Sequence, residues 1–340
     1  MTTATPLADF IAEKGVLLAD GATGTNLFAM GLESGEAPEL WNESAPEKIV
    51  KLHQDFVDAG ADIFLTNSFG GTRQRLKLHK AEDRVFELNK KAAEIARSVA
   101  DKADRKIIVA GSVGPTGELL VPLGALTYEF AVESFREQIK GLKAGGVDVI
   151  WIETMSASGE MQAASEAAAA EEMEFVCTAS FDTAGKTMMG IHPAEMGKIF
   201  EKSPQAPTAY GANCGVGASD ILSSLLDMKD AAPDAKIVIK GNCGIPEFQE
   251  DKIVYSGTPD LMARYVELAI DGGASIIGGC CGTSCDHLRA MRVALDNHVK
   301  AERPTVEFIC DQIGPMRNTK AAAAGEGPQR ERRTGGRRRK

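Results

Sequence analysis

The chain turns from a helix-like segment into a strand at Asp271-Gly272-Gly273-Ala274-Ser275, where glycine follows the last helical residue and the apolar run Ser275 to Ile277 begins. Glycine readily takes the left-handed backbone conformation that commonly ends a helix. Two other stretches have the same pattern, Asp58-Ala59-Gly60-Ala61-Asp62 and Ala144-Gly145-Gly146-Val147-Asp148. Repeated helix-to-strand junctions of this kind are typical of a fold in which strands and helices alternate.

Short apolar runs alternate with helical patterns eight times between residues 16 and 280. Such runs suit parallel strands that are buried on both faces, and eight strand–helix units in about 260 residues fit a single-domain (β/α)8 TIM barrel. An open doubly wound sheet is the alternative, but Gly21-Ala22-Thr23-Gly24 lacks the G-x-G-x-x-G spacing of a dinucleotide site. The predicted strands are Val16 to Ala19, Ile63 to Thr66, Ile107 to Gly111, Val147 to Ile152, Phe175 to Ala179, Thr208 to Ala212, Lys236 to Ile239 and Ser275 to Ile277.

The composition is that of an ordinary globular protein, with 340 residues of which 44% are hydrophobic and 25% charged. No apolar run approaches the roughly 20 residues needed to span a bilayer, and the N-terminus lacks the basic and apolar regions of a signal peptide. We therefore expect a cytoplasmic protein that does not enter a membrane. Seven cysteines in such a chain argue against a disulfide framework and leave metal binding or reactivity open.

Residues 1 to 310 are predicted to form the barrel, and residues 311 to 340 a basic tail. From residue 316 onward the chain carries nine Lys or Arg and two Glu, although its overall net charge is -10. The tail is rich in Ala, Gly and Arg and has no apolar period, which predicts disorder. Because the remainder is strongly acidic, we expect no nucleic-acid partner. The tail is interpreted as a solvated terminus or as an electrostatic arm for an acidic partner.

Glycine-flanked cysteines follow two of the predicted strands. Cys280 and Cys281 lie in Gly278-Gly279-Cys280-Cys281-Gly282-Thr283, and Cys214 lies in Asn213-Cys214-Gly215. Neighbouring side chains of a strand point to opposite faces, so two adjacent thiols can serve one site only where glycine lets the backbone leave the strand. Three thiolates make most of a zinc site, and an exchangeable fourth position is typical of catalytic zinc.

The other cysteines leave alternatives open. Cys243 in Asn242-Cys243-Gly244 repeats the Cys214 motif, and Cys285 lies at a predicted helix start, so each is a rival ligand. Cys177 and Cys310 are interpreted as small buried hydrophobes.

Function in a barrel belongs at the carboxyl ends of the strands. Carboxylates such as Asp20 and Glu153 can bind an ammonium group there by charge-assisted hydrogen bonds, and backbone N–H groups of Gly21 to Thr25 can bind a carboxylate. Alternatively, Asp20 caps a turn and the asparagines bond only to loop backbone. A zinc ion would keep a bound thiol ionised and therefore nucleophilic. Together with groups that bind ammonium and carboxylate, it predicts alkylation of an amino acid that bears a thiol. Polar residues follow the first seven predicted strands, and Cys280 with Cys281 follows the eighth: the seven are Asp20, Asn67, Ser112, Glu153, Asp182, Asn213 and Asn242.

Five motifs between residues 10 and 297 resemble the zinc-dependent homocysteine S-methyltransferases: Asp20-Gly21-Ala22-Thr23-Gly24-Thr25, Thr66-Asn67-Ser68-Phe69-Gly70, Ile152-Glu153-Thr154, Asn213-Cys214-Gly215 and Gly278-Gly279-Cys280-Cys281-Gly282-Thr283. The resemblance implies a (β/α)8 barrel and an enzyme that methylates homocysteine to methionine, with the homocysteine sulfur on zinc. It implies zinc ligands Cys214, Cys280 and Cys281. It also implies the substrate-binding residues Asp20, Gly21, Ala22, Thr23, Asn67, Glu153 and Asn213, with Asp20 and Glu153 receiving the amino group.

The methyl donor is predicted to be a methylated corrinoid on a separate protein. The betaine-using branch of the family receives the quaternary ammonium in a tyrosine-containing aromatic site, whereas this chain has Phe69-Gly70-Gly71-Thr72 and Thr154 at those positions and only Phe69 and Trp151 nearby. The pattern resembles the homocysteine module of cobalamin-dependent methionine synthase standing alone. Betaine and S-methylmethionine are alternative donors, and another thiol is an alternative substrate. A non-catalytic corrinoid-protein partner with a structural zinc is an alternative of another class.

Overall fold

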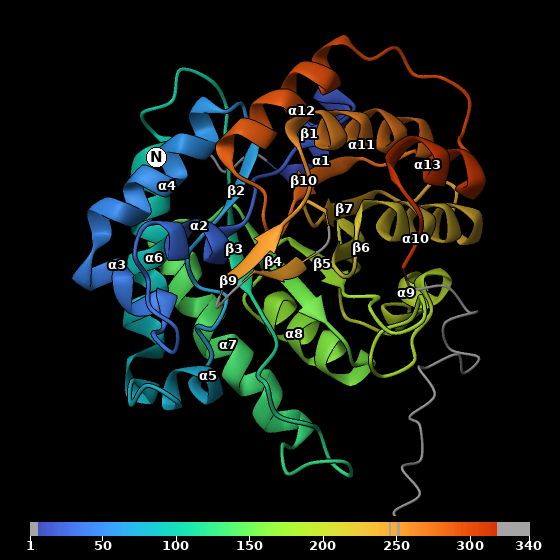
Figure 1. Ribbon diagram of the computed structural model, residues 1–340. Coiled ribbons are helices and arrows are strands. Elements are labelled where there is room, and N and C mark those ends of the chain that lie inside the picture. Colours follow the sequence, from blue (N-terminus) through green and yellow to red (C-terminus); the bar gives the residue numbers. More distant parts are fainter. Residues whose placement is uncertain (1–5, 245, 250–251, 318–340) are drawn as a thin grey trace, which may run out of the picture.

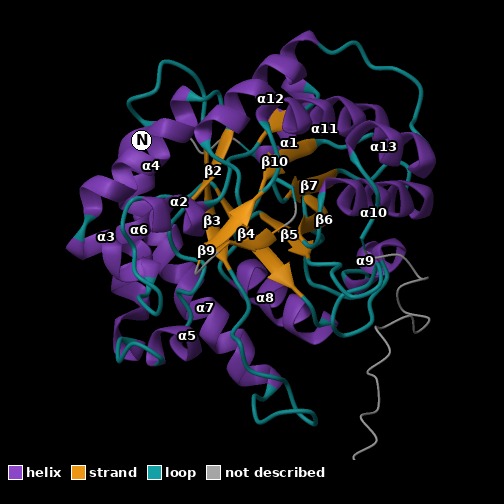
Figure 2. Ribbon diagram, in the orientation of Figure 1, coloured by secondary structure: helices purple, strands orange, loops and turns teal. Residues whose placement is uncertain are grey.

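The computed structural model describes residues 6–244, 246–249 and 252–317. Its centre is a parallel sheet in the order β1-β10-β7-β6-β5-β4-β3-β2, and a parallel bridge between Ala19 and Ile63 joins the two outer strands. The sheet therefore closes into a barrel (Figure 2), which confirms the predicted (β/α)8 fold and excludes the open sheet. The strands are β1 (Leu17–Leu18), β2 (Ile63–Leu65), β3 (Ile108–Val113), β4 (Val149–Met155), β5 (Phe175–Ala179), β6 (Ala209–Cys214), β7 (Ile237–Gly241) and β10 (Ile276–Gly279).

Helices surround this barrel (Figure 1). The described helices are α1 (Leu7–Lys14), α2 (Thr23–Ala29), α3 (Trp41–Ser44), α4 (Pro46–Asp58), α5 (Arg73–Lys77), α6 (Val85–Ala100), α7 (Tyr128–Gly145), α8 (Ser158–Ala170), α9 (Met196–Ile199), α10 (Ala218–Ala231), α11 (Pro259–Gly272), α12 (Cys285–Asn297) and α13 (Val306–Ile313). Three short 3-10 turns are η1 (Pro38–Leu40), η2 (Glu82–Arg84) and η3 (Pro193–Glu195).

The three glycine junctions have the predicted role. Gly60, Gly146 and Gly273 have φ angles of 99°, 96° and 91°. Gly146 and Gly273 are the left-handed caps that end α7 and α11. Because a β-branched or bulky residue is disfavoured at these angles, glycine fixes where the chain leaves a helix and enters the next strand.

The core has two layers because neighbouring strand residues face opposite sides. Val149 and Trp151 belong to a cluster inside the barrel, whereas Ile150 and Ile152 pack outward against the helices. This alternation between two apolar layers explains why the strands read as continuous apolar runs. The inner cluster also contains side chains of α1, which therefore closes the amino end of the barrel: Leu7, Phe10 and Ile11.

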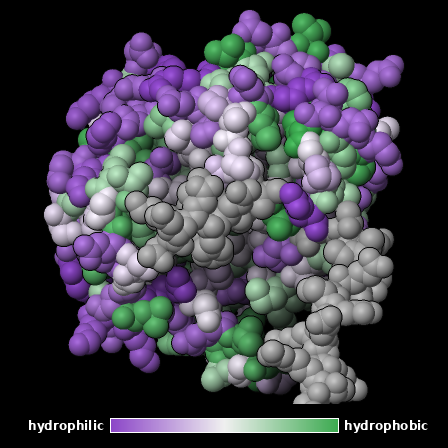
Figure 3. Space-filling model, in the orientation of Figure 1, coloured by the Kyte–Doolittle hydropathy of each residue, from purple (hydrophilic) through white to green (hydrophobic). Residues whose placement is uncertain are grey.

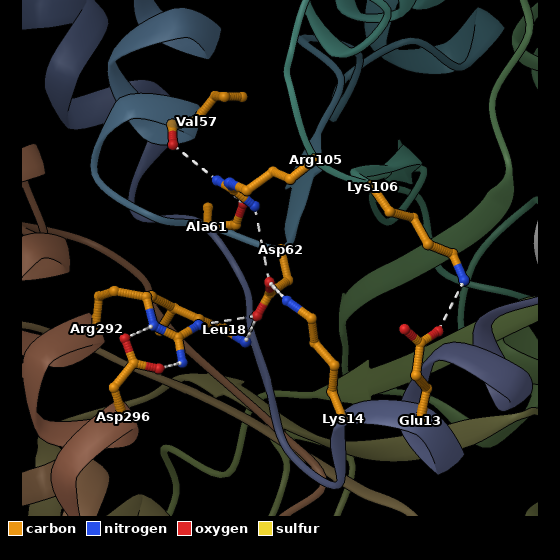
Figure 4. A network of polar contacts seen from close by, with 10 residues as sticks. All are labelled: Glu13, Lys14, Leu18, Val57, Ala61, Asp62, Arg105, Lys106, Arg292 and Asp296. Carbon is orange, nitrogen blue, oxygen red and sulfur yellow. Dashed lines mark hydrogen bonds and ion pairs between the residues drawn. The ribbon is translucent and has the colours of Figure 1, made fainter.

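Asp62 directly precedes β2, at the amino end of the barrel, and forms a network of polar contacts there (Figure 4). Its N–H donates to the Leu18 carbonyl at 2.7 Å, and its Oδ2 accepts the Leu18 N–H at 3.0 Å. The carboxylate also contacts Lys14 at 2.7 Å, Arg292 at 3.0 Å and Arg105 at 3.7 Å. Asp62 is 1% exposed, so it acts as a buried counter-charge that closes the seam of the barrel.

The strands β8 (Pro246–Gln249) and β9 (Lys252–Tyr255) form an antiparallel hairpin between β7 and α11. Helix α13 extends beyond the predicted barrel boundary at residue 310, and the predicted tail lies outside the described residues from 318 onward. On the face drawn in Figure 3, hydrophobic side chains form small separate groups among hydrophilic ones, as is usual for protein surfaces. Among the described helices, none has the length and apolar character to cross a membrane.

Candidate functional site

Three cysteines meet at the carboxyl end of the barrel. Cys214 is the last residue of β6, and Cys280 and Cys281 directly follow β10. Their three sulfur atoms all lie within 4.8 Å of one another, and the Sγ atoms of Cys214 and Cys281 are 4.0 Å apart. Sulfur ligands bound at 2.3 Å to one tetrahedral zinc ion are about 3.8 Å apart. The cluster therefore fits a zinc ion after only small shifts of the side chains.

The backbone leaves both strands at the cysteines. Cys214 has a φ angle of 62° and Gly215 one of 75°, and Gly282 has a φ of 80° after the cysteine pair. A left-handed conformation is uncommon for a residue with a side chain, and such strain is concentrated at functional sites. The departure turns the adjacent thiols of Cys280 and Cys281 toward one site, as the flanking glycines predict.

The thiols form a hydrogen-bonded cluster in which one sulfur carries negative charge easily. Hydrogen bonds from Cys214 and Cys280 lower the pKa of Cys281 to about 3. The pKa of Cys214 is raised, because its hydrogen bonds to the other two thiols favour the protonated form. A metal ion that binds these sulfur atoms would replace the shared protons, because metal binding to thiols releases protons.

Asn242 holds the two cysteine segments together. Its Oδ1 accepts the N–H of Cys281 at 3.0 Å, and its Nδ2 donates to the carbonyl of Gly215 at 2.7 Å. Asn242 follows β7, which lies between β6 and β10 in the sheet. The side chain therefore connects the Cys214 segment to the cysteine pair across one strand.

We expect Asn242→Ala to weaken zinc binding by about 10- to 100-fold, because groups that orient metal ligands have effects of this size. The measurement is a competitive titration with a zinc chelator. Asn297→Ala is the matched control, since Asn297 ends α12 and its side chain donates to the Val293 carbonyl within the same helix. Equal zinc affinity of the two variants would contradict the role of Asn242.

Asp20 follows β1 and lies beside a buried lysine. Its Oδ1 is 2.5 Å from Nζ of Lys240, and its Oδ2 accepts the N–H of Leu65 at 2.8 Å. Burial raises the pKa of Asp20, and the Lys240 ammonium opposes this rise. Burial disfavours the charged form of Lys240, but the carboxylates of Asp20 and Glu153 outweigh it and raise the Lys240 pKa. The short contact is therefore an ion pair.

Glu153 lies inside β4 rather than after it. The strand continues to Met155, but its register with β5 shifts between Ile152 and Met155, and Thr154 has a φ of 62°. An irregularity of this kind redirects side chains. The Glu153 Oε1 accepts a hydrogen bond from the Ser112 hydroxyl at 2.5 Å. Burial raises the pKa of Glu153 to about 7, against the opposing charge of Lys240.

The loop of Gly21, Ala22 and Thr23 connects β1 to α2 and is tied to the cysteine segment. The N–H of Ala22 donates to the Thr283 carbonyl at 3.2 Å, and the N–H of Gly282 donates to the Thr25 hydroxyl at 3.2 Å. A Cβ on Gly21 would lie 2.6 Å from the same Thr283 oxygen, so only glycine fits. The Asp20 loop and the cysteine pair thus form one continuous rim.

The two predicted asparagines make structural hydrogen bonds. Asn67 donates to the carbonyl of Pro38 at 2.7 Å. Asn213 accepts the N–H of Thr154 at 2.8 Å and the hydroxyl of Thr178 at 2.7 Å. Asn213 therefore holds the irregular end of β4 next to the Cys214 segment. Substrate binding by either side chain stays a prediction.

A sequence model of the homocysteine S-methyltransferase family matches residues 17–295. The chain belongs to this family. The match extends from β1 almost to the end of α12 and includes all three clustered cysteines. The matched residues therefore include the cysteine cluster and the strand-end carboxylates Asp20 and Glu153.

Curated relatives within the family are much longer. The chain is 30% identical to methionine synthase of Mycobacterium tuberculosis (strain ATCC 25618 / H37Rv), with 95% of this chain and 28% of that protein covered. It is 29% identical to methionine synthase of Mycobacterium leprae (strain TN), with 86% and 25% covered. The chain thus spans about a quarter of the length of these relatives.

A solved structure of the same fold is the metallated homocysteine methyltransferase MmuM from Escherichia coli. It superposes with a TM-score of 0.70 over 85% of this chain and 99% of that chain, at 24% sequence identity. This likeness supports the barrel fold independently of the predicted elements.

Two site residues were missed by the sequence analysis. Lys240 was not singled out, because it comes directly after the predicted apolar strand Lys236 to Ile239. Tyr255, at the end of β9, lies beside the cysteine cluster, where burial and the charge of Cys281 raise its pKa. The unusual length of the connection between β7 and α11 was the available signal for the second residue. Neither rival cysteine belongs to the cluster, which contains Cys214, Cys280 and Cys281 as the three-ligand group of the described residues.

Proposed function

We propose that this protein transfers a methyl group to the sulfur of homocysteine, giving methionine, and that Cys214, Cys280 and Cys281 hold a zinc ion for this reaction. The observation that carries the proposal is the convergence of three thiols within 4.8 Å at the carboxyl end of a barrel of this family. Three protein ligands leave a fourth position for the substrate, as in catalytic zinc sites.

Zinc bound there would lower the pKa of a substrate thiol, so that the nucleophilic thiolate is present at neutral pH. The protein contributes a rigid frame for this chemistry. Asn242 fixes the cysteine segments, and the Thr25 hydroxyl anchors the turn after the cysteine pair. A frame of this kind limits the motion of the reacting sulfur and favours an in-line approach to the methyl group.

The substrate amino acid would lie between the cysteines and the two acidic strand ends. The Glu153 carboxylate is within electrostatic range of Cys280, Lys240 and Asp20. A charged carboxylate at this place can bind the ammonium group. We assign the substrate carboxylate to the backbone of the Gly21 to Thr23 turn, which adjoins the cysteine pair through Thr283.

The methyl donor is assigned to a methylated corrinoid on a separate protein. The assignment follows the resemblance of the motifs to the homocysteine module of cobalamin-dependent methionine synthase, and the similarity of the chain to two methionine synthases supports it. A quaternary ammonium donor needs a free aromatic face. Of the two aromatic residues noted in the sequence, Phe69 is 37% exposed but Trp151 is not free. Trp151 is 0% exposed, and the Lys240 ammonium lies 5.7 Å from its ring centre.

The test is a panel of methyl donors with the zinc-loaded full chain and homocysteine. We expect methionine to form with a methylated corrinoid protein and not with betaine or S-methylmethionine. Turnover with betaine alone would contradict the donor assignment. Absorption spectroscopy at the zinc edge gives a second measurement: homocysteine should raise the number of sulfur ligands from three to four. An unchanged metal environment together with no turnover would favour a structural zinc instead.

A further inference from the structure

We propose that Lys240 is an internal counter-cation that occupies Asp20, so that Glu153 alone receives the substrate ammonium group. Lys240 thereby determines the net charge of the group formed by Asp20, Glu153 and Lys240, which is the charge that the substrate meets. The inference rests on the proposed function, since it assumes an amino acid thiol. It departs from the expectation that both carboxylates bind the amino group.

The oxygens of Asp20 are already engaged without a substrate. Oδ1 contacts the Lys240 ammonium at 2.5 Å, and Oδ2 accepts the N–H of Leu65 at 2.8 Å. The residue is 0% exposed. A ligand would have to displace Lys240 to reach the carboxylate, and this would leave a buried ammonium without its partner, which is strongly unfavourable.

Lys240 is held in place along its whole length. It lies in β7, level with Asn213 of β6 and Gly278 of β10. Its side chain is 4% exposed. A Cβ on Gly278 would be 3.0 Å from Cγ of Lys240, so the glycine leaves room for the lysine stem. The ammonium lies over the Trp151 ring, where a cation–π contact adds to the ion pair with Asp20.

Glu153 differs from Asp20 in both exposure and bonding. Ser112 donates to its Oε1 at 2.5 Å, whereas Oε2 receives no hydrogen bond from the described residues. The residue is 9% exposed. One carboxylate oxygen is therefore available to an incoming donor at the barrel mouth.

The charges of Asp20, Glu153 and Lys240 also favour binding of the substrate ammonium by one carboxylate. The ammonium of Lys240 balances Asp20, and Glu153 then carries the one unbalanced charge of the three. One substrate ammonium neutralises the charge of Glu153. A thiol of the same length without an amino group would leave Glu153 uncompensated, and a buried charge without a partner is costly. The site should therefore bind a thiol that carries an amino group more tightly than a thiol of the same length that lacks one.

The experiment compares the binding of homocysteine and of 4-mercaptobutanoate, which lacks the amino group, to zinc-loaded protein by calorimetry at pH 8. Wild-type protein should prefer homocysteine. Glu153→Gln should weaken the binding of homocysteine by about 10- to 100-fold, the range of a charge-assisted hydrogen bond. It should not weaken the binding of 4-mercaptobutanoate, because the variant removes the charge that this thiol leaves uncompensated. Binding of the second thiol shows that the variant is folded and retains zinc.

The double variant Asp20→Asn with Lys240→Met is the matched variant, because it removes the ion pair as a unit and leaves Glu153 as the one unbalanced charge. It should keep the preference for homocysteine. The inference is overturned if the double variant loses this preference as Glu153→Gln does. Failure of wild-type protein to methylate homocysteine with any donor would instead reject the proposed function.

Discussion

Cys281→Ala is expected to abolish stoichiometric zinc binding and methyl transfer together. The sulfur of Cys281 is 4.0 Å from that of Cys214, and its backbone N–H is held by Asn242. If four ligands share the roughly 10–16 kcal/mol of a zinc site equally, each accounts for about 3–4 kcal/mol, or a hundred- to thousandfold in affinity. Two remaining thiols would then lose the metal during dialysis.

Metal analysis after dialysis and a methyl-transfer assay measure the two losses. Cys285→Ala is the matched control, because Cys285 begins α12 on the same segment but is not part of the cluster. The control should keep both zinc and activity. Full activity of the Cys281 variant in zinc-free form would contradict the proposed mechanism.

The second large effect is expected at the opposite end of the barrel. Asp62→Ala should lower the free energy of unfolding by about 1–3 kcal/mol, the usual cost of leaving a buried hydrogen-bonding group unsatisfied, since the side chains of Lys14 and Arg292 are themselves 39% and 20% exposed. The change leaves Lys14 and Arg292 without their shared carboxylate and removes an acceptor from the Leu18 N–H (Figure 4). These contacts join β1 to β2, so their loss weakens the closure of the barrel.

Urea unfolding followed by circular dichroism provides the measurement. Asp296→Ala is the control, because Asp296 also pairs with Arg292 but its side chain is 58% exposed. Exposed ion pairs contribute about 0–1 kcal/mol. Equal unfolding midpoints for the two variants would show that Asp62 does not close the barrel.

Local patterns were sufficient to predict the fold. The eight apolar runs and the glycine junctions depend on residues that are close in sequence, and both were confirmed. The limits of the elements were less well predicted. The predicted fourth strand ends at Ile152, whereas β4 continues to Met155. Two hydrogen bonds between Asn213 and Thr154 support that extension, and they join residues 59 positions apart.

The sequence by itself determined the barrel and the three thiols, because glycine-flanked cysteines at strand ends can be recognised from neighbouring residues alone. Only the tertiary structure decided which partner each polar group has. Asp20 and Lys240 are 220 residues apart and meet because the barrel closes. Strand periodicity shows which way a side chain points, but not what lies across the barrel. For that reason the pairing of two carboxylates with one substrate ammonium, which the residue types favour, changes to one carboxylate once Lys240 is seen beside Asp20.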